Sequence, residues 1–274
     1  MKVAIAQMQH KRSKSANIDM AAAAIREAAR EGALVTSLPE LFNTIYFCAS
    51  EDPSLFDLAE TIPGPTTEAL APVARETGAF IIAPLYEQDA TVRGVRYNTA
   101  AVIGPDGTLL GRYRKHSIPN VRTDTTSANE KFYFRPGNAG FPVFDTGEGV
   151  RFGIIICYDR HYPEHARCVA LNGADILFVP VTTWGISQPV FELELRAHAL
   201  FNGFYVAGVN RVGCDEGEDK RVFGESLLVD PGGNVIASAG GEAPGLAYCD
   251  VDPARVAAQR DAWGMFRDRR PDAY

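Results

Sequence analysis

The sequence lacks the features that mark several classes of protein. It has no run of about 18 consecutive apolar residues, the length that a membrane-spanning helix needs. Its N-terminal residues, MKVAIAQMQH, contain no long apolar core of the kind found in a signal peptide. It has no long basic block, and its formal net charge of −7 disfavours nucleic acid or an anionic membrane as a partner. These absences predict a cytoplasmic protein that neither crosses a membrane nor binds nucleic acid.

Cysteine is also scarce, and its pattern excludes two further kinds of site. The five cysteines are an odd number, are widely spaced and include no CxxC pair. Such a pattern fits neither a disulfide framework nor a zinc site. We therefore expect free thiols in a reducing compartment and no metal.

The sequence does contain short apolar segments that alternate with helical ones, which predicts layers of helix over sheet. Two apolar hairpins, around Pro-Asp-Gly near residue 106 and Pro-Gly-Gly near residue 232, add antiparallel strands. No linker divides the chain, so residues 1–274 are expected to form one domain. The polar and aromatic tail, from about residue 254, is expected to be an arm that packs on a partner subunit. The predicted strands are 2–7, 33–37, 79–85, 97–103, 108–113, 152–156, 175–181, 204–210, 223–229 and 234–238, and the predicted helices are 17–31, 65–77, 164–172 and 189–202.

The stretch RFGIIICYDRHYPEHAR, residues 151–167, is the most informative part of the chain. Residues 152–156 form an apolar run that is typical of a strand buried on both faces. Cys157 follows directly, and Pro163 then suits the first turn of a helix. Cys157 is therefore predicted at a sharp junction between strand and helix, which can hold a nucleophile rigidly.

Two charged residues occupy comparable positions. Glu40 follows the predicted strand 33–37, and Lys115 follows the return strand of the first hairpin. Taken alone, each of the three residues has an ordinary alternative. Glu40 can be a solvated loop carboxylate, Lys115 a surface ammonium, and Cys157 a small buried side chain without a catalytic role. Because ligands bind outside the strand ends of open sheets, the three side chains will converge if those ends share one edge.

A thiol, a carboxylate and an ammonium make a coherent catalytic set. The thiolate is the nucleophile, yet a thiol is mostly protonated at neutral pH, so the Glu40 carboxylate can take its proton. The Lys115 ammonium can stabilise an oxyanion, and the backbone N–H of Tyr158 is a candidate second donor. His161 and His165 are expected to follow the turn away from the sulfur, so no Cys–His pair is predicted.

These motifs resemble those of the carbon–nitrogen hydrolase (nitrilase) superfamily over nearly the whole chain. The matching pieces are VAIAQ at the start, then LPELF, RYRKHSIP and GIIICYDRHYPE. The resemblance implies an α/β fold, a four-layer α-β-β-α sandwich, with no cofactor and with pairing into homodimers or larger homo-oligomers. It implies that Glu40 is the general base, Lys115 the oxyanion stabiliser and Cys157 the nucleophile.

The resemblance further implies that Glu130, in ANEKFYFRPGN, is a second active-site glutamate. The alternative for Glu130 is a loop residue that forms salt bridges with Lys131 and Arg135. A different class of function also stays open, in which the same fold is not catalytic and Cys157 serves as a sensor thiol.

The stretch CYDRHYPE resembles the branches that hydrolyse N-carbamoyl compounds. In those that bind carbamoyl amino acids, a basic residue shortly after the cysteine holds the substrate carboxylate, and Arg160 matches it. We therefore expect an N-carbamoyl amino acid, hydrolysed to ammonia, carbon dioxide and the free amine; N-carbamoylputrescine or an aliphatic amide is the alternative. Arg160 can instead tie down Asp159, Glu164 or a loop carbonyl. Further substrate-binding candidates are Tyr158, His161 and Thr183.

Overall fold

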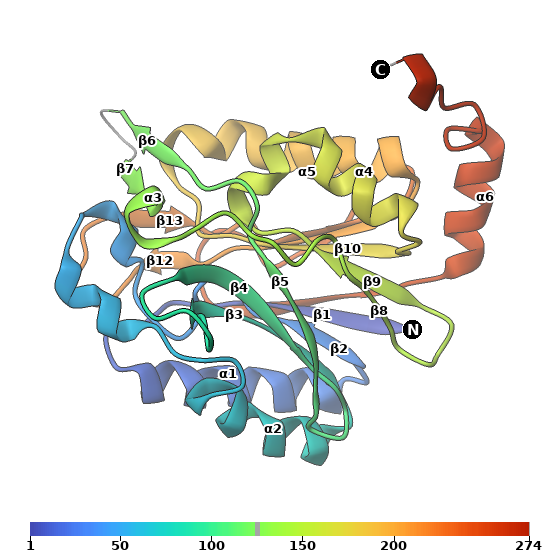
Figure 1. Cartoon of the computed structure of the whole chain (residues 1–274). Helices are drawn as coiled ribbons and strands as arrows, with labels where there is room; N and C mark the ends of the chain where they lie inside the picture. The colour runs from blue at the N-terminus through green and yellow to red at the C-terminus, as the bar shows by residue number, and fades with distance from the viewer. Residues whose placement is uncertain (124–126, 274) are drawn as a thin grey trace.

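Two six-stranded sheets pack face to face between two pairs of helices, which gives a four-layer α-β-β-α sandwich (Figure 1). The computed structural model describes residues 1–123 and 127–273. The predicted domain, 1–274, also includes residues 124–126 and 274, which lie outside this description. Among the described residues, none of the helices combines the length and apolarity that crossing a membrane requires.

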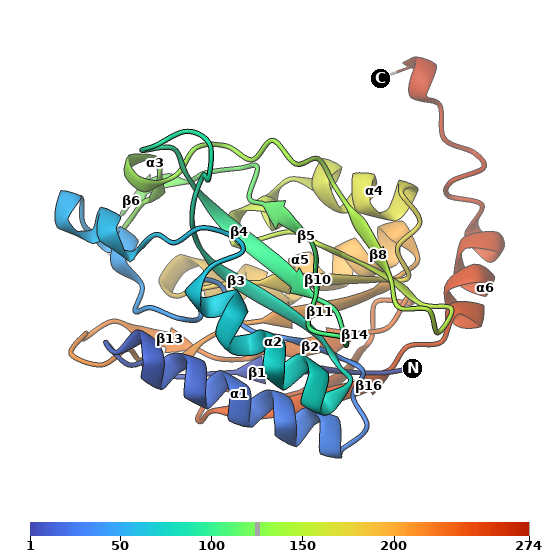
Figure 2. The ribbon, with the colours of Figure 1, turned by 60° about the horizontal axis from the view of Figure 1, so that its bottom comes forward.

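The first sheet has the strand order β16-β1-β2-β3-β4-β5 and carries α1 and α2 on its outer face (Figure 2). Its central strands β1, β2 and β3 are parallel, whereas β16, β4 and β5 pair antiparallel. Helix α1 begins after Ser13, whose side chain accepts a hydrogen bond from Ala16 N, and α2 ends at the left-handed Gly78. The bounds are β1 Lys2–Gln7, α1 Lys14–Arg30, β2 Val35–Ser37, α2 Pro65–Thr77, β3 Phe80–Gln88, β4 Arg96–Ile103, β5 Leu109–Arg114 and β16 Gly245–Asp250.

The second sheet has the order β15-β14-β11-β10-β9-β8 and carries α4 and α5 on its outer face (Figure 1). Strands β9, β10 and β11 run parallel, so their carboxyl ends lie at one edge. The bounds are β8 Val143–Asp145, β9 Arg151–Ile154, α4 Pro163–Leu171, β10 Ile176–Pro180, α5 Gln188–Asn202, β11 Tyr205–Val209, β14 Leu227–Val229 and β15 Val235–Ser238.

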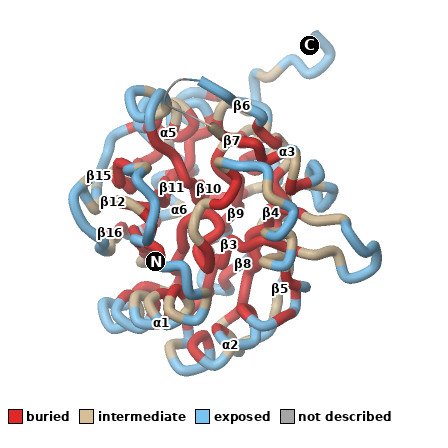
Figure 3. The backbone as a smooth tube through the Cα atoms, turned by 90° about the vertical axis from the view of Figure 1, so that its left-hand side faces the viewer, coloured by how far each residue is buried: buried red, intermediate tan, exposed pale blue. Residues whose placement is uncertain are grey.

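The main core lies between the sheets, and Figure 3 shows the buried backbone concentrated in the strands. Phe80 of the first sheet meets Phe152 of the second edge to face, with ring centroids 6.1 Å apart. Shorter elements cover the carboxyl ends of the strands or extend from the sandwich. They are β6 Asn120–Arg122, β7 Ser127–Asn129, α3 Glu130–Tyr133, β12 Val212–Cys214, β13 Arg221–Phe223, α6 Pro253–Trp263 and 3₁₀ turns at Phe47–Ala49, Pro53–Leu58, Cys157–His161, Gly185–Ser187 and Pro271–Ala273.

The mixed sheets and the first hairpin agree with the sequence prediction. The second hairpin also forms around its predicted turn, with β14 and β15 paired antiparallel, but it is shorter than predicted. Its first strand, predicted at 223–229, is divided because Gly224 and Glu225 have φ of 71° and 57°. Phe223 therefore ends β13, which pairs with β12, and only Leu227–Val229 continue the main sheet. The tail predicted as an arm contains the helix α6, followed by an extended segment that lies beyond the layers (Figure 1).

Candidate active site

Glu40, Lys115 and Cys157 each follow the end of a strand, namely β2, β5 and β9, and the structure brings them to one place between the two sheets. Lys115 Nζ lies 2.8 Å from Glu40 Oε1 and 2.6 Å from Glu130 Oε2. Cys157 lines a pocket together with Glu130. The four residues predicted to be catalytic thus form one cluster, and Glu130 is an ion-pair partner of Lys115.

The Glu40 carboxylate is fully buried, and both of its oxygens are engaged. Oε1 accepts hydrogen bonds from Lys115 Nζ and from Asn98 Nδ2, each at 2.8 Å. Oε2 accepts one from the backbone N–H of Thr182, also at 2.8 Å. Donors on three segments therefore fix the carboxylate, which is the arrangement that a preorganised base requires.

Lys115 and Glu130 are excluded from solvent and interact strongly. Burial disfavours the charged amine, but the neighbouring carboxylates of Glu130 and Glu40 outweigh burial and hold the pKa of Lys115 well above its ordinary value. Burial raises the pKa of Glu130 to about 7, although Lys115 opposes this shift. Tyr46 Oη donates a hydrogen bond to Glu130 Oε1 at 3.1 Å. The Lys115 ammonium thus forms ion pairs with both carboxylates, and Glu130 can exchange a proton near neutral pH.

Cys157 has a left-handed backbone, with φ of 49°, at the start of a 3₁₀ turn. Such a conformation is costly for a residue other than glycine and persists where the surroundings enforce it, often at active sites. Burial and the Glu40 charge raise the pKa of Cys157 to about 12, against the opposing effects of Lys115 and Arg160. The resting thiol is therefore neutral at pH 7, and its Sγ lies 3.8 Å from the carbonyl oxygen of Thr182.

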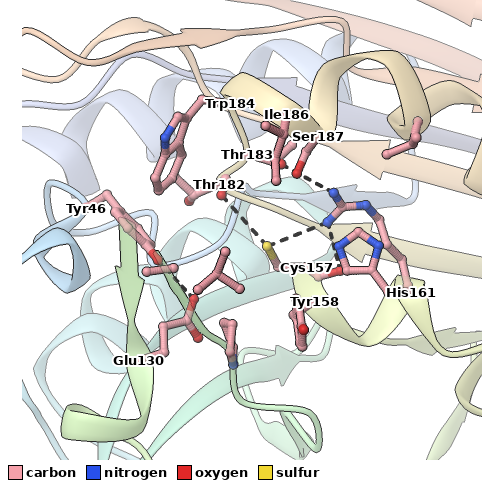
Figure 4. Close-up of a pocket in the computed structure, with 15 residues that line it drawn as sticks. Tyr46, Glu130, Cys157, Tyr158, His161, Thr182, Thr183, Trp184, Ile186 and Ser187 are labelled. Carbon is pink, nitrogen blue, oxygen red and sulfur yellow. Dashed lines mark hydrogen bonds between the residues drawn. The ribbon is translucent and has the colours of Figure 1, made fainter. Parts of the chain in front are cut away.

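The pocket above the thiol has a volume of about 160 Å³ and a largely apolar wall (Figure 4). Tyr46 and Trp184 meet edge to face on one side, with ring centroids 4.9 Å apart. The predicted substrate-binding residues all line this pocket: Tyr158, Arg160, His161 and Thr183.

Arg160 is only 2% exposed, and other groups of the protein hold its guanidinium. Nη1 donates to the carbonyl oxygen of Cys157 at 3.0 Å, Nη2 donates to Thr183 Oγ1 at 3.3 Å, and Nε lies 2.9 Å from Glu194 Oε2. The loop carbonyl foreseen as its structural partner is therefore that of Cys157. Asp159, a second foreseen partner, instead accepts hydrogen bonds from Tyr113 Oη and two backbone N–H groups.

His161 lines the pocket wall, and its Nδ1 lies 2.5 Å from Glu194 Oε1, so this ring nitrogen faces a carboxylate and not the sulfur of Cys157. His165 packs beside Phe141 and Tyr162.

Two residues of the site, Thr182 and Asn98, were not predicted from the sequence. Thr182 follows β10 just as Cys157 follows β9, so the same strand-end signal could have found it. Asn98 lies inside β4, and nothing in the sequence separates it from its neighbours. Within the described ranges 1–123 and 127–273, no group of three or more His, Cys, Asp or Glu side chains is arranged to hold a metal ion.

Comparison with known proteins agrees with this geometry. The family model described as carbon-nitrogen hydrolase matches residues 2–261. A citrullinase from Francisella tularensis is 34% identical over 100% of this chain and 96% of its own length. An N-carbamoylputrescine amidase from Solanum lycopersicum is 34% identical over 95% of this chain and 89% of its own length. The crystal structure of a carbon-nitrogen hydrolase from Helicobacter pylori G27 has a TM-score of 0.90 at 31% identity, with 100% of this chain and 96% of that chain covered. The chain therefore belongs to the carbon–nitrogen hydrolase family of the nitrilase superfamily.

Proposed function

We propose that the chain hydrolyses an N-carbamoyl (ureido) compound through a thioester-type intermediate on Cys157. The observation that carries this proposal is the neutral Cys157 thiol beside an ammonium, Lys115, which bridges the two carboxylates of Glu40 and Glu130. A neutral thiol needs a base at the moment of attack, and the cluster holds one in a fixed orientation.

In the first half of the reaction, Glu40 removes the thiol proton while Sγ bonds to the carbonyl carbon of the terminal urea. The negative charge that develops on the carbonyl oxygen is stabilised by the Lys115 ammonium and the backbone N–H of Tyr158. The carbon–nitrogen bond to the terminal NH₂ then breaks, and the proton held by Glu40 passes to this nitrogen. Ammonia leaves, and a carbamoyl group remains bonded to Cys157.

In the second half, water attacks the carbon of the thioester and gives a proton to Glu40, which returns it to the departing sulfur. Glu130 orients this water, because its carboxylate lines the pocket and is fixed by Lys115 and Tyr46. The product is a carbamic acid, which decomposes to carbon dioxide and the free amine. Both halves use the same base, so the resting state is restored.

The group at the end of the substrate opposite the urea determines which ureido compound the pocket favours. The Arg160 guanidinium on the pocket wall supports a carboxylate there, since guanidinium and carboxylate match in charge and geometry. An N-carbamoyl amino acid is therefore our first candidate. A ureido amine is the second, because Glu194 already compensates the charge of Arg160 and because one relative is an N-carbamoylputrescine amidase.

The test is ammonia release from a panel of ureido acids, ureido amines, aliphatic amides and nitriles. We expect a ureido acid to be turned over fastest, and we expect Cys157→Ala to abolish the signal. Cys168→Ala is the matched control, since Cys168 is a free cysteine of α4 outside the pocket. A ureido amine at the top of the panel would establish the second candidate. No ammonia from any member, together with reversible oxidation of Cys157, would instead indicate a thiol sensor.

We further propose that the chain acts as a homo-oligomer in the cytoplasm. Apolar side chains are exposed on the helical layer of the second sheet, with Leu193 at 65% and Phe201 at 54%. Light scattering after size exclusion tests this assembly, and Phe201→Glu should lower the mass if α5 lies in the contact.

A further inference from the structure

Leu41, the residue that follows Glu40, has a left-handed backbone with φ of 51° although it is not glycine. Its side chain is fully buried beside Phe47 and Tyr86. A left-handed leucine is disfavoured because Cβ crowds the following carbonyl, so the surrounding structure must hold it. The position of Glu40 therefore depends on whatever fixes this turn.

Arg211 supplies the contacts that fix it. It follows β11 by two residues and has no exposed surface. Its Nη2 donates to the carbonyl oxygens of both Glu40 and Leu41, each at 2.8 Å. These two carbonyls flank the strained φ, so one guanidinium holds both ends of the unusual turn. A lysine ammonium has a single nitrogen, so it cannot hold these carbonyls while a second nitrogen binds another partner, as the forked guanidinium does through Nη1.

Asp215 completes the arrangement and joins it to the second carboxylate. Its Oδ2 accepts from Arg211 Nη1 at 2.7 Å and from the backbone N–H of Tyr46 at 2.8 Å. Tyr46 in turn donates to Glu130 through its hydroxyl group. The Arg211–Asp215 pair therefore contacts the segment 40–46 at both ends, and that segment carries Glu40 itself and Tyr46, which donates to Glu130.

Another neighbour of this pair is His10, which is fully buried, with Nδ1 3.7 Å from Asp215 Oδ1. Burial lowers the pKa of His10 to about 4, so its ring is neutral at pH 7 and leaves the Arg211–Asp215 charges balanced.

We propose that Arg211 and Asp215 are positioning residues for the hydrolysis, because they hold the segment 40–46 so that Glu40 and Tyr46 face Lys115 and Glu130. This inference rests on the proposed role of Glu40 as the base. Neither residue lines the pocket near Cys157 described above, so both act through the segment they hold.

The central variant is Arg211→Lys, which keeps the charge and loses the fork. A misplaced catalytic group costs up to about a hundredfold in rate, so we expect kcat to fall by about ten- to a hundredfold while KM changes by less than about threefold. The matched control is Arg260→Lys, because the Arg260 guanidinium also donates to two backbone carbonyls, those of Ala174 and Asn202. The control should leave kcat unchanged.

A second variant, Asp215→Asn, keeps an oxygen that can accept from Arg211 and Tyr46, removes the charge and places an amide NH₂ where Oδ1 faces His10. It should fold and lower kcat to a smaller extent, so it tests the inference even if Arg211→Lys does not fold.

Single-turnover formation of the Cys157 adduct, followed by mass spectrometry, separates positioning from general damage. Because Arg211 acts through Glu40, Arg211→Lys should slow adduct formation in the wild-type background. In a Glu40→Gln background, which is already slow, the same change should lower the rate little further.

All measurements use the panel substrate that the wild-type protein turns over fastest. Normal kcat in a folded Arg211→Lys or Asp215→Asn protein, or fully additive losses with Glu40→Gln, would overturn the inference while the proposed function stands. A wild-type protein that releases no ammonia from any panel member would overturn both together.

Discussion

Lys115 Nζ lies 2.6 Å from Glu130 Oε2, and both side chains are almost completely buried. The same ammonium lies 2.8 Å from Glu40, so one positive charge is shared between two carboxylates. Burial disfavours the charged form of Glu130 most strongly, and the nearby Glu40 carboxylate adds to the effect, so the pKa of Glu130 is raised although Lys115 opposes the shift. Glu130 therefore titrates near neutral pH, and its protonation is linked to folding.

The first prediction concerns this linkage. Burial raises the pKa of Glu130 from its ordinary 4.5 to about 7. Between these values the folded chain binds more protons than the unfolded chain, so this group's contribution to the free energy of unfolding is present below about pH 4.5 and is lost as pH rises through about 7. Glu130→Gln removes the titration. Urea unfolding from about pH 5 to about pH 8 should show the variant gaining stability relative to the wild type.

The control for this measurement is Glu164→Gln, an exposed glutamate in the first turn of α4. Its unfolding free energy should follow that of the wild type across the range. If the unfolding free energies of Glu130→Gln and the wild type differ by the same amount at all pH values, Glu130 does not titrate as inferred.

Glu130→Gln also tests the role of this residue in turnover. Glutamine preserves the shape and can still accept from Tyr46 and Lys115, but its neutral oxygen is a weaker hydrogen-bond acceptor for the water that Glu130 orients. A misplaced reactant costs up to about a hundredfold in rate, so kcat should fall by about that factor with a folded protein. Steady-state ammonia release measures this. Near-normal kinetics would leave Glu130 as a structural ion-pair partner only.

The sequence allowed much of this site to be predicted because the relevant signal is local. An apolar run followed by a polar residue marks the end of a buried strand, and Glu40, Lys115 and Cys157 all carry that mark. Sheet topology then brings strand ends together without any further information from the side chains. The sequence analysis predicts a sharp junction at Cys157 but neither the 3₁₀ turn nor the positive φ, which come with hydrogen bonds from Arg160 to the Cys157 carbonyl and from the Ile156 N–H to Asp159.

The parts that escaped prediction are those in which an ordinary residue acquires its role from distant neighbours. Arg211 looks like any polar residue after a strand, yet it contacts carbonyls about 170 residues earlier in the chain. The first strand of the second hairpin is shorter than predicted for a related reason. Its sequence, FGESLLV, begins and ends with apolar residues, but Glu225 takes a left-handed conformation and its N–H donates to the carbonyl oxygen of Gly240.

The triad prediction concerns covalent chemistry. Cys157→Ala removes the nucleophile and should abolish turnover, and Glu40→Gln should lower it by about 10³-fold or more because residues of a catalytic unit fail together. Quenched mass spectrometry of the wild-type protein should find an acyl or carbamoyl adduct on Cys157. Substantial turnover by Cys157→Ala, or persistent absence of an adduct, would count against the covalent route.

Gly137 provides a prediction about packing next to Lys115. Its N–H donates to the carbonyl oxygen of Lys115 at 2.7 Å, and a Cβ built there would lie 2.0 Å from the carbonyl oxygen of Arg114. Backbone cannot move aside as a flexible side chain can, so Gly137→Ala must displace Lys115. We expect a loss of about 1–3 kcal/mol in unfolding free energy and a drop in kcat. Gly245→Ala, with nothing within 4 Å, is the control and should change neither.

The last prediction decides the class of ureido substrate. Arg160 holds the carbonyl oxygen of Cys157, so Arg160→Leu should lower kcat/KM for every substrate through the backbone of the nucleophile. A carboxylate substrate should lose more. A charge-assisted hydrogen bond is worth roughly 1.5–3 kcal/mol, so the additional loss for a ureido acid should be about ten- to a hundredfold.

The informative quantity is the ratio of kcat/KM for a ureido acid to that for a neutral alkylurea of equal length. General damage to Cys157 affects both substrates and cancels in this ratio, whereas loss of a carboxylate contact lowers the ratio alone. Glu194→Gln provides the complementary test, because removing the anion that pairs with Arg160 leaves the guanidinium charge uncompensated and should raise the ratio. If the ratio stays constant in both variants, Arg160 and Glu194 serve the turn at Cys157, and a ureido amine becomes the favoured substrate.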